Sequence, residues 1–420
     1  MLLRSSRISS IRAREVLDSR GNPTIACRVS LGSGASGEAQ VPSGRSVGRY
    51  EALELRDGGK RYGGQGVLKA VKRVNTDIAH VLRRADASRQ QDIDHVMAEL
   101  DGTPNKASLG ANAILAVSLA TARVLSVHRR MPLWRSLRET FAFARPASLP
   151  TPTMNVLNGG AHADWSLDVQ ECMIVPRQRT MSDRVRAGAE TFQVLRKLLK
   201  DEGFAMTVGD EGGFAPKLKR VENAFQLLMR AIRKAGYRPG TDIALATDIA
   251  ASELYDRRTK TYQWKTEGKS YTAAELLHRY RLWQDMFPLV SIEDPFAEDD
   301  WEAWKHAVPV LKMKCGIIGD DLFTTDVKRL ERGIRERAAT GILIKPNQIG
   351  TLTETVDAIT MAQKAKFAVS VSHRSGETAD TFIADLAVAC GAEYIKSGAL
   401  SRSERVEKYN RLMAIEGEMG

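Results

Sequence analysis

The chain has 420 residues, of which 43% are hydrophobic and 27% charged, and its length predicts two domains rather than one core. It contains no uncharged apolar run of about 18 residues that would predict a membrane span, and its Arg- and Ser-rich start lacks the apolar centre of a secretory signal. Four scattered cysteines without a CxxC pair argue against a zinc site and a disulfide framework, so we expect a cytoplasmic protein, with a short organellar presequence as the minor alternative.

The net charge is +11, and it is unevenly distributed. Residues 1–140 contain about 23 Lys and Arg against about 13 Asp and Glu, whereas the rest of the chain is close to neutral. One interpretation is a solvated basic face that aids solubility. The other is a docking surface for an anionic partner, such as nucleic acid or an acidic membrane surface.

The first third of the chain predicts a small α+β domain. Residues 7–31 hold two short strand-like runs around a turn signal at 19–23. Residues 67–84 and 109–125 space their apolar residues at helical intervals. The proline-rich segment 141–152 is typical of a linker. We therefore expect a basic domain at residues 1–138 and a second domain at residues 139–420.

In the second domain, six short apolar runs each end on a charged residue. Most successive ends are about 23–28 residues apart, which fits one strand, one loop and one returning helix per step. Continuous apolar runs are typical of parallel strands buried on both faces. The pattern predicts an α/β fold with a TIM-like βα barrel, whose chemistry lies at the carboxyl ends of the strands: Asp248, Glu293, Asp320, Lys345, His373-Arg374 and Lys396.

Three consecutive strand ends are acidic. At one barrel mouth, Asp248, Glu293 and Asp320 would lie close together. Their carboxylates would then repel each other unless a cation lay among them. Hard oxygen ligands of this kind suit Mg²⁺. Three separate surface acids at helix starts are the alternative.

Two later strand ends are lysines. A cationic neighbourhood lowers the pKa of a lysine below its reference value near 10.4. A metal ion and Lys396 would supply that neighbourhood, which leaves Lys345 available as a general base. Two salt-bridged structural lysines are the alternative.

Several loops carry weaker signals. Arg374 offers a fork of donors and Ser375 a hydroxyl, which suit a phosphate or carboxylate group. Glu211 lies on the glycine-rich turn VGDEGGFAP, and His162 ends the loop NVLNGGAH. Gln170 and Glu171 are predicted to end another apolar run. Each of these signals is weak when taken alone.

Longer motifs make the chain resemble the enolase family along essentially its whole length. The stretches that carry the resemblance occur in one order and include AREVLDSRGNPT, VPSGRSVGRYEALELRDG, LGANAILAVSLA, MNVLNGGAHAD, VGDEGGFAP, SIEDPF, GDDLFTT, LIKPNQIGTLTET and SHRSGETADTFIADLAV. The resemblance implies a carbon–oxygen lyase of glycolysis that converts 2-phospho-D-glycerate reversibly to phosphoenolpyruvate. It also implies two Mg²⁺ ions per site and at least a homodimer.

The resemblance assigns roles to individual residues. Lys345 matches the base that removes the proton next to the substrate carboxylate. Glu211, helped by Glu171, matches the group that protonates the departing hydroxyl. The remaining assignments are Asp248, Glu293 and Asp320 to the first Mg²⁺, Ser46 to the second, Lys396 to the substrate carboxylate, Arg374 and Ser375 to the phosphate, and His162, His373 and Gln170 to the site lining.

Three residues depart from the family pattern. The lid loop usually reads PSGAST, so Arg45 replaces a small residue and Val47 a threonine. An extra cation there could attract the substrate or hinder loop closure, which often limits turnover. Cys172 stands where an aromatic residue is usual and could loosen the packing of Glu171.

Two other functions stay open from the sequence. The basic first 140 residues and Arg45 favour a binding protein built on an enolase scaffold. Another lyase or racemase of the same superfamily is the third hypothesis, although the retained SHRSGE and KPNQIG stretches argue against it.

Overall fold

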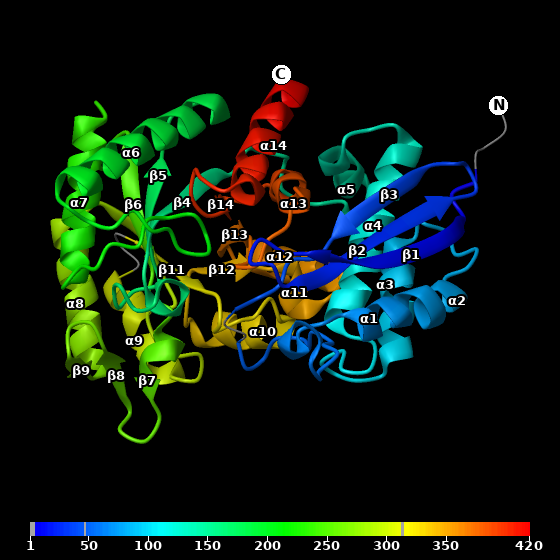
Figure 1. Cartoon of the computed structure of the whole chain (residues 1–420), viewed down its shortest axis with the longest axis horizontal. Helices are drawn as coiled ribbons and strands as arrows, with labels where there is room; N and C mark the ends of the chain where they lie inside the picture. Colours follow the sequence, from blue (N-terminus) through cyan, green and yellow to red (C-terminus); the bar gives the residue numbers. More distant parts are fainter. Residues whose placement is uncertain (1–4, 46–47, 312–314) are drawn as a thin grey trace.

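The computed structural model describes residues 5–45, 48–311 and 315–420. A small α+β domain precedes a closed eight-stranded barrel, and the chain passes from one to the other between α5 (Leu133–Phe141) and β4 (Thr151–Asn158). In Figure 1 the first domain lies on the right and the barrel with its helices on the left. The predicted α/β class with a TIM-like barrel and a smaller α+β domain is confirmed. The exact boundary at residue 138 stays a prediction.

The first domain is built on an antiparallel sheet in the order β1-β2-β3. β1 (Ile8–Leu17) and β2 (Pro23–Leu31) flank the predicted turn, and β3 (Ser36–Gln40) is a third strand that the sequence did not indicate. Helix α4 (Ala111–Arg129) covers the sheet. The two approach so closely that a Cβ on Gly37 would lie 2.3 Å from the Val124 amide nitrogen, so only glycine fits there.

Helix α4 is long and apolar enough to span a membrane by length and composition alone. In the structure, 83% of its most apolar 18-residue window is buried inside the protein. It is therefore the core helix of the first domain.

The segment predicted as one helix over 67–84 is helical but not uniform. It consists of α1 (Leu68–Arg73), a π-helical turn at Val74–Ile78 and α2 (Ala79–Val81). The π turn contains Asn75, which donates to the Ala13 carbonyl at 3.0 Å and accepts from the Ala13 amide at 2.8 Å. The wider turn thus joins the helical segment to β1. Helix α3 (Gln90–Asp101) completes the domain.

The barrel closes in the order β10-β11-β12-β13-β14-β4-β5-β6. Every neighbouring pair is parallel except those of β5, which runs antiparallel to both β4 and β6. The prediction that Gln170 and Glu171 end a strand is therefore wrong. Glu171 begins β5, and because the strand is reversed its first residue lies at the same mouth as the last residues of the others. The remaining strands are β5 (Glu171–Pro176), β6 (Ile243–Asp248), β10 (Leu289–Glu293), β11 (Gly316–Gly319), β12 (Gly341–Ile344), β13 (Ala368–Ser372) and β14 (Tyr394–Lys396).

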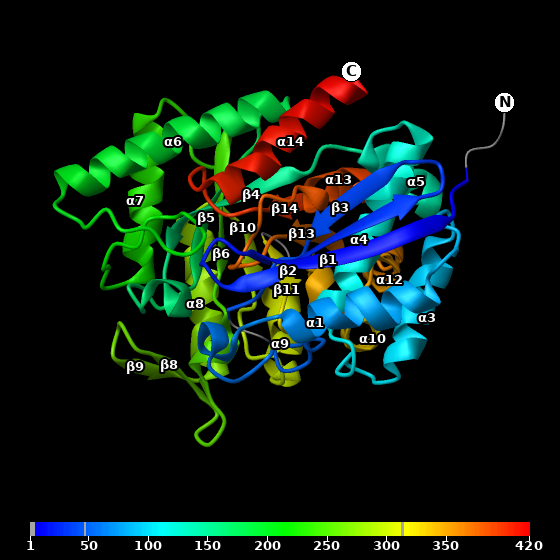
Figure 2. The same cartoon turned by 45° about the vertical axis from the view of Figure 1, so that its right-hand side comes forward.

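Helices surround the barrel, and one insertion explains its irregular spacing. The small sheet of β7 (Tyr255–Asp256), β8 (Thr261–Trp264) and β9 (Lys269–Tyr271) lies between β6 and α8 and projects from the barrel in both views (Figures 1 and 2). It accounts for the long gap between Asp248 and Glu293. The helices are α6 (Met181–Asp201), α7 (Val221–Lys234), α8 (Ala273–Met286), α9 (Trp301–Leu311), α10 (Val327–Glu336), α11 (Pro346–Ile349), α12 (Leu352–Lys364), α13 (Phe382–Cys390) and α14 (Ser403–Met419), with 3₁₀ turns at Arg61–Gly64, Gly160–Ala163 and Ala251–Leu254.

Polar contacts tie the two domains together at the start of α12. Asp94 of α3 is buried and accepts from the amide of Thr353 at 2.9 Å and from its hydroxyl at 2.6 Å. Ser118 of α4 accepts from the Leu352 amide at 3.0 Å. Carboxylate and hydroxyl acceptors thus satisfy the free amides of this helix start.

We expect Asp94 to make stability depend on pH. Burial raises the pKa of Asp94 to about 6, above its reference near 3.9. A group whose pKa is higher in the folded than in the unfolded state contributes its full stabilisation at pH values below the unfolded-state pKa. This stabilisation is lost as the pH rises through the folded-state pKa. The free energy of unfolding of the wild type, relative to Asp94→Asn, should fall by about 1 kcal/mol between about pH 5 and pH 7. Urea denaturation measures it, and parallel pH curves for the two proteins would contradict the expectation.

Candidate functional site

The charged strand ends meet in one cavity at the barrel mouth. The Nζ atom of Lys396, the last residue of β14, lies 2.8 Å from Glu293 Oε1, 3.1 Å from Asp248 Oδ2 and 3.1 Å from Glu171 Oε2. These carboxylates come from β10, β6 and β5, and all four side chains are buried. One ammonium group therefore joins carboxylates from three other strands.

Lys345 occupies a second position in the same cavity. Its ammonium pairs with the Asp320 carboxylate, which also accepts from Gln348 Nε2 at 2.9 Å. Burial lowers the pKa of Lys345, but the nearby carboxylates, Asp320 first, together raise it by more. In the chain by itself the nearest charge to Lys345 is therefore negative, and the lowering expected from a bound metal ion and Lys396 stays a prediction.

Carboxylates outnumber cations in this cavity. Among the described residues, eight carboxylates and three cationic side chains line it. Burial and the charge of Asp248 hold the pKa of Glu293 well above its usual range, and burial and Asp321 do the same for Asp294. A buried excess of negative charge with oxygen donors is the environment that a hard divalent cation stabilises.

Two groups of side chains could hold a metal ion. Within the described ranges, ligand atoms lie within 4.8 Å of one another in the set Asp294, Asp320 and Asp321 and in the set His162, Glu171 and Glu211. The predicted set differs, because Lys396 lies between Asp248 and Glu293 whereas Asp320 groups with Asp321 and with Asp294 of the preceding loop. Asp294 accepts from the backbone amides of Asp320 and Asp321, each at 2.8 Å, which fixes this group. Ser46, predicted to reach a second ion, lies outside the described residues.

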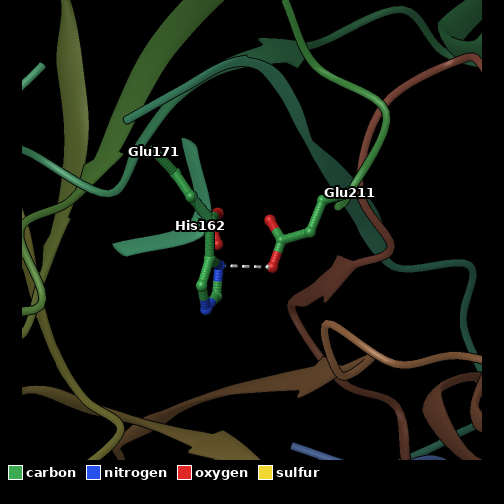
Figure 3. Close-up of side chains that lie close together, drawn as sticks. All are labelled: His162, Glu171 and Glu211. Atoms are coloured by element: carbon green, nitrogen blue, oxygen red, sulfur yellow. Dashed lines mark ion pairs between the residues drawn. The ribbon is translucent and has the colours of Figure 1, made fainter. Parts of the chain in front are cut away.

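Glu171 and Glu211 lie close together in the same cavity, beside His162. Glu211 accepts from Asn155 Nδ2 at 2.6 Å and lies 3.2 Å from His162 Nδ1 (Figure 3). Burial raises the pKa of Glu211, but His162 and the nearby cations lower it well below its usual range. Burial and the charge of Glu211 hold the pKa of Glu171 well above its own. The pKa values of the two carboxylates are thus shifted in opposite directions, as is typical of coupled acids.

His373 is held in one tautomer by an arginine. Arg405 of α14 donates to His373 Nδ1 at 2.6 Å. A guanidinium has only donors, so Nδ1 must carry a lone pair and the ring proton must lie on Nε2. Nε2 is 4.0 Å from Glu211 Oε1. Burial and Arg405 hold the pKa of His373 well below its usual value, which agrees with a neutral ring whose Nε2–H is available to a ligand.

The predicted anion grip is shared between the two domains. Arg374 Nη1 donates to Glu51 Oε2 at 2.8 Å, and Arg374 Nη2 to Glu51 Oε1 at 3.2 Å. Arg20 Nη1 donates to the Ser375 hydroxyl at 3.3 Å. Sequence reasoning missed Glu51 and Arg20. Both lie in the quoted motif stretches, but neither follows a strand of the barrel, so no pattern assigned them to this site.

The residues that depart from the family pattern have defined places. Arg45 Nη1 lies 3.1 Å from Asp210 Oδ2, next to Glu211, and its side chain is 43% exposed. Arg45 thus lies at the rim of the cavity and not inside it. Cys172 is buried in β5, and burial raises the pKa of its thiol, so it is a packing residue. Val47 lies outside the described residues.

Gln170, which was predicted to line the site, donates to Asp248 Oδ2 at 3.2 Å.

Comparison with known families covers nearly the whole chain. Residues 146–420 match the family described as "Enolase, C-terminal TIM barrel domain", and residues 8–137 match the family described as "Enolase, N-terminal domain".

We expect Lys396 to be required for stability as well as for the site. Replacing it with methionine leaves the carboxylates of Glu171, Asp248 and Glu293 buried without their common counter-charge. The free energy of unfolding should fall by about 3–5 kcal/mol, and added Mg²⁺ should restore part of it. Thermal and urea denaturation measure both effects, with the exposed Lys364→Met as the control. Equal stability of the two variants would contradict this role.

Proposed function

The chain belongs to the enolase family, and from this premise we propose that it is a carbon–oxygen lyase that interconverts 2-phospho-D-glycerate and phosphoenolpyruvate with Mg²⁺. The observation that carries the proposal is the arrangement of the mouth. Lys345 and Lys396 lie on its strand ends with the carboxylates, and the neighbouring acids Glu171 and Glu211 lie beside Lys396, which Glu171 contacts. A base and an acid in one buried cavity are what removal of a proton and a hydroxyl requires.

The carboxylate-rich side of the cavity fits a divalent cation. Asp248, Glu293 and Asp320 would hold the first ion, and Ser46 is proposed for the second. Such ions stabilise the negative charge that develops on the substrate carboxylate when the neighbouring proton leaves. A lysine or histidine base that works beside Mg²⁺ is the general pattern of this superfamily.

The chain's own residues divide the remaining work. Lys345 takes the proton at Nζ, and it can do so only when Asp320 no longer pairs with its ammonium, because that pair holds the proton on the lysine. Lys396 Nζ orients the substrate carboxylate, and His373 Nε2–H lines the site around it. Arg374 and the Ser375 hydroxyl bind the phosphate. The pair of Glu171 and Glu211 supplies one proton to the departing hydroxyl.

A second activity is proposed for the first domain, as an anion-binding surface. The exposed side chains of Lys69, Lys72 and Arg83 lie on or next to the helical segment α1–α2, and among the described residues none of them forms an ion pair. Exposed cations that no neighbouring acid neutralises are free to attract an anionic partner, and a solvated basic face that aids solubility is the alternative. The cytoplasmic homodimer expected from the sequence stays a prediction.

Replacing Lys345 tests the lyase directly. Lys345→Ala should lower kcat for 2-phosphoglycerate by about 10³-fold or more, because no other group can take the proton, while Mg²⁺ binding is retained. Ultraviolet absorbance of the enol product, measured with and without Mg²⁺, reports turnover. The exposed Lys364→Ala is the control. Full activity of Lys345→Ala would refute the assignment of the base, and an inactive wild type would refute the proposed reaction.

Charge reversal tests the anion-binding surface. The variant with Lys69→Glu, Lys72→Glu and Arg83→Glu should bind a labelled single-stranded oligonucleotide at least about tenfold more weakly than the wild type, and wild-type binding should weaken as salt rises. Fluorescence anisotropy measures both. If the wild type does not bind the oligonucleotide at physiological salt, the proposed anion-binding activity is refuted. If it binds only phosphatidylserine vesicles, the partner is an acidic membrane surface and not nucleic acid.

A further inference from the structure

One carboxylate of the first domain reaches into the anion grip of the barrel. Glu51 and Arg374 are both buried, with 5% and 4% of their side chains exposed, and they pair through two parallel hydrogen bonds. Burying two charges costs free energy unless the geometry between them is good. The two-pronged arrangement supplies that geometry, and it fixes the plane of the guanidinium as well as its position.

Glu51 is itself held from both sides. Its Oε1 accepts from the Gly48 amide at 2.9 Å and lies 3.5 Å from Gln348 Nε2. The amide of the next residue, Ala52, donates to the Gln348 carbonyl at 2.7 Å. Gln348 also donates to Asp320. The carboxylate is therefore anchored to the barrel as well as to its own loop and cannot swing away without breaking several hydrogen bonds.

Without Glu51, Arg374 would have another acidic neighbour. Besides Glu51, the Asp320 carboxylate is the next strongest electrostatic attraction for this guanidinium. An arginine drawn towards Asp320 would compete with Lys345 for it and would leave the place where a phosphate is bound. Glu51, together with Asn347 Oδ1, which accepts from Arg374 Nη1 at 3.1 Å, thus fixes the direction in which Arg374 points.

We propose that Glu51 is a positioning residue for phosphate binding: its carboxylate holds the Arg374 guanidinium in the orientation that receives the substrate phosphate, so that the barrel's anion site is completed by the first domain. The inference rests on the proposed function for the identity of the substrate. The hydrogen bonds through which Glu51 acts do not depend on it.

Glu51→Gln tests the proposal, because it keeps the shape of the side chain and removes its charge. We expect KM for 2-phosphoglycerate and the dissociation constant of inorganic phosphate each to rise about tenfold or more, while kcat changes by less than about threefold. Calorimetric titration with inorganic phosphate gives a reading that is independent of turnover. The split between KM and kcat separates positioning from a general loss of structure.

The matched control is Glu54→Gln. Glu54 lies three residues further along the same loop, where it pairs with Arg56 at 2.6 Å, and its charge acts on Arg374 less strongly than the charge of Glu51 does. The variant Glu54→Gln removes one negative charge, as Glu51→Gln does, and should leave phosphate binding within about twofold of the wild type. If Glu51→Gln does not fold, Glu51→Asp keeps the charge but shortens its reach, and it should weaken phosphate binding in the same direction.

Three results would overturn the proposal: unchanged phosphate binding in Glu51→Gln, tighter binding because Glu51 merely repels the phosphate, or an equal loss in Glu54→Gln. The wild type could bind inorganic phosphate in a way that depends on Glu51 and yet not dehydrate 2-phosphoglycerate. That result would support the positioning role and refute the proposed reaction.

Discussion

Buried negative charge is the constraint around which this protein is organised. Carboxylates from several strands face one another at the barrel mouth, and the only cations among the described residues that line the cavity with them are Lys345, Lys396 and Arg374. Each of these cations is bound to carboxylates: Lys396 to three, Lys345 to Asp320 and Arg374 to Glu51. Burial, together with the neighbouring acids that remain in excess, raises the pKa values of Glu171, Glu293 and Asp294. A divalent cation is the simplest further source of positive charge.

The same constraint links binding to catalysis. The ion pair with Asp320 raises the pKa of Lys345, so in the proposed reaction this lysine acts as the base only when that carboxylate is engaged elsewhere. Burial and the charge of Glu211 raise the pKa of Glu171, whereas His162 lowers the pKa of Glu211 against the effect of burial. In the proposed reaction, removing the proton from Lys345 is the step that makes the site competent.

The barrel could be predicted from the sequence because its signals are local. Apolar runs that end on Asp248, Glu293, Asp320, Lys345 and Lys396 identify strand ends, and parallel strands bring their ends to one mouth. The direction of β5 could not be predicted, since a buried strand looks the same read either way, and so Glu171 was assigned to the wrong end of it. The pKa of Lys345 and the role of Glu51 depend on which partner lies nearest in space, which spacing along the chain does not specify. The π turn at Val74–Ile78 likewise follows from a tertiary contact, that of Asn75 with β1.

The central claim is that the acid excess at the mouth binds a divalent cation, and a titration with Mn²⁺ followed by electron paramagnetic resonance tests it most directly, because Mn²⁺ prefers the same oxygen ligands as Mg²⁺. The account predicts that the wild type removes Mn²⁺ from solution, that Mg²⁺ displaces it, and that the double variant Glu293→Gln, Asp320→Asn does not bind it. A wild type that leaves Mn²⁺ free, or a double variant that binds it equally well, would contradict the account.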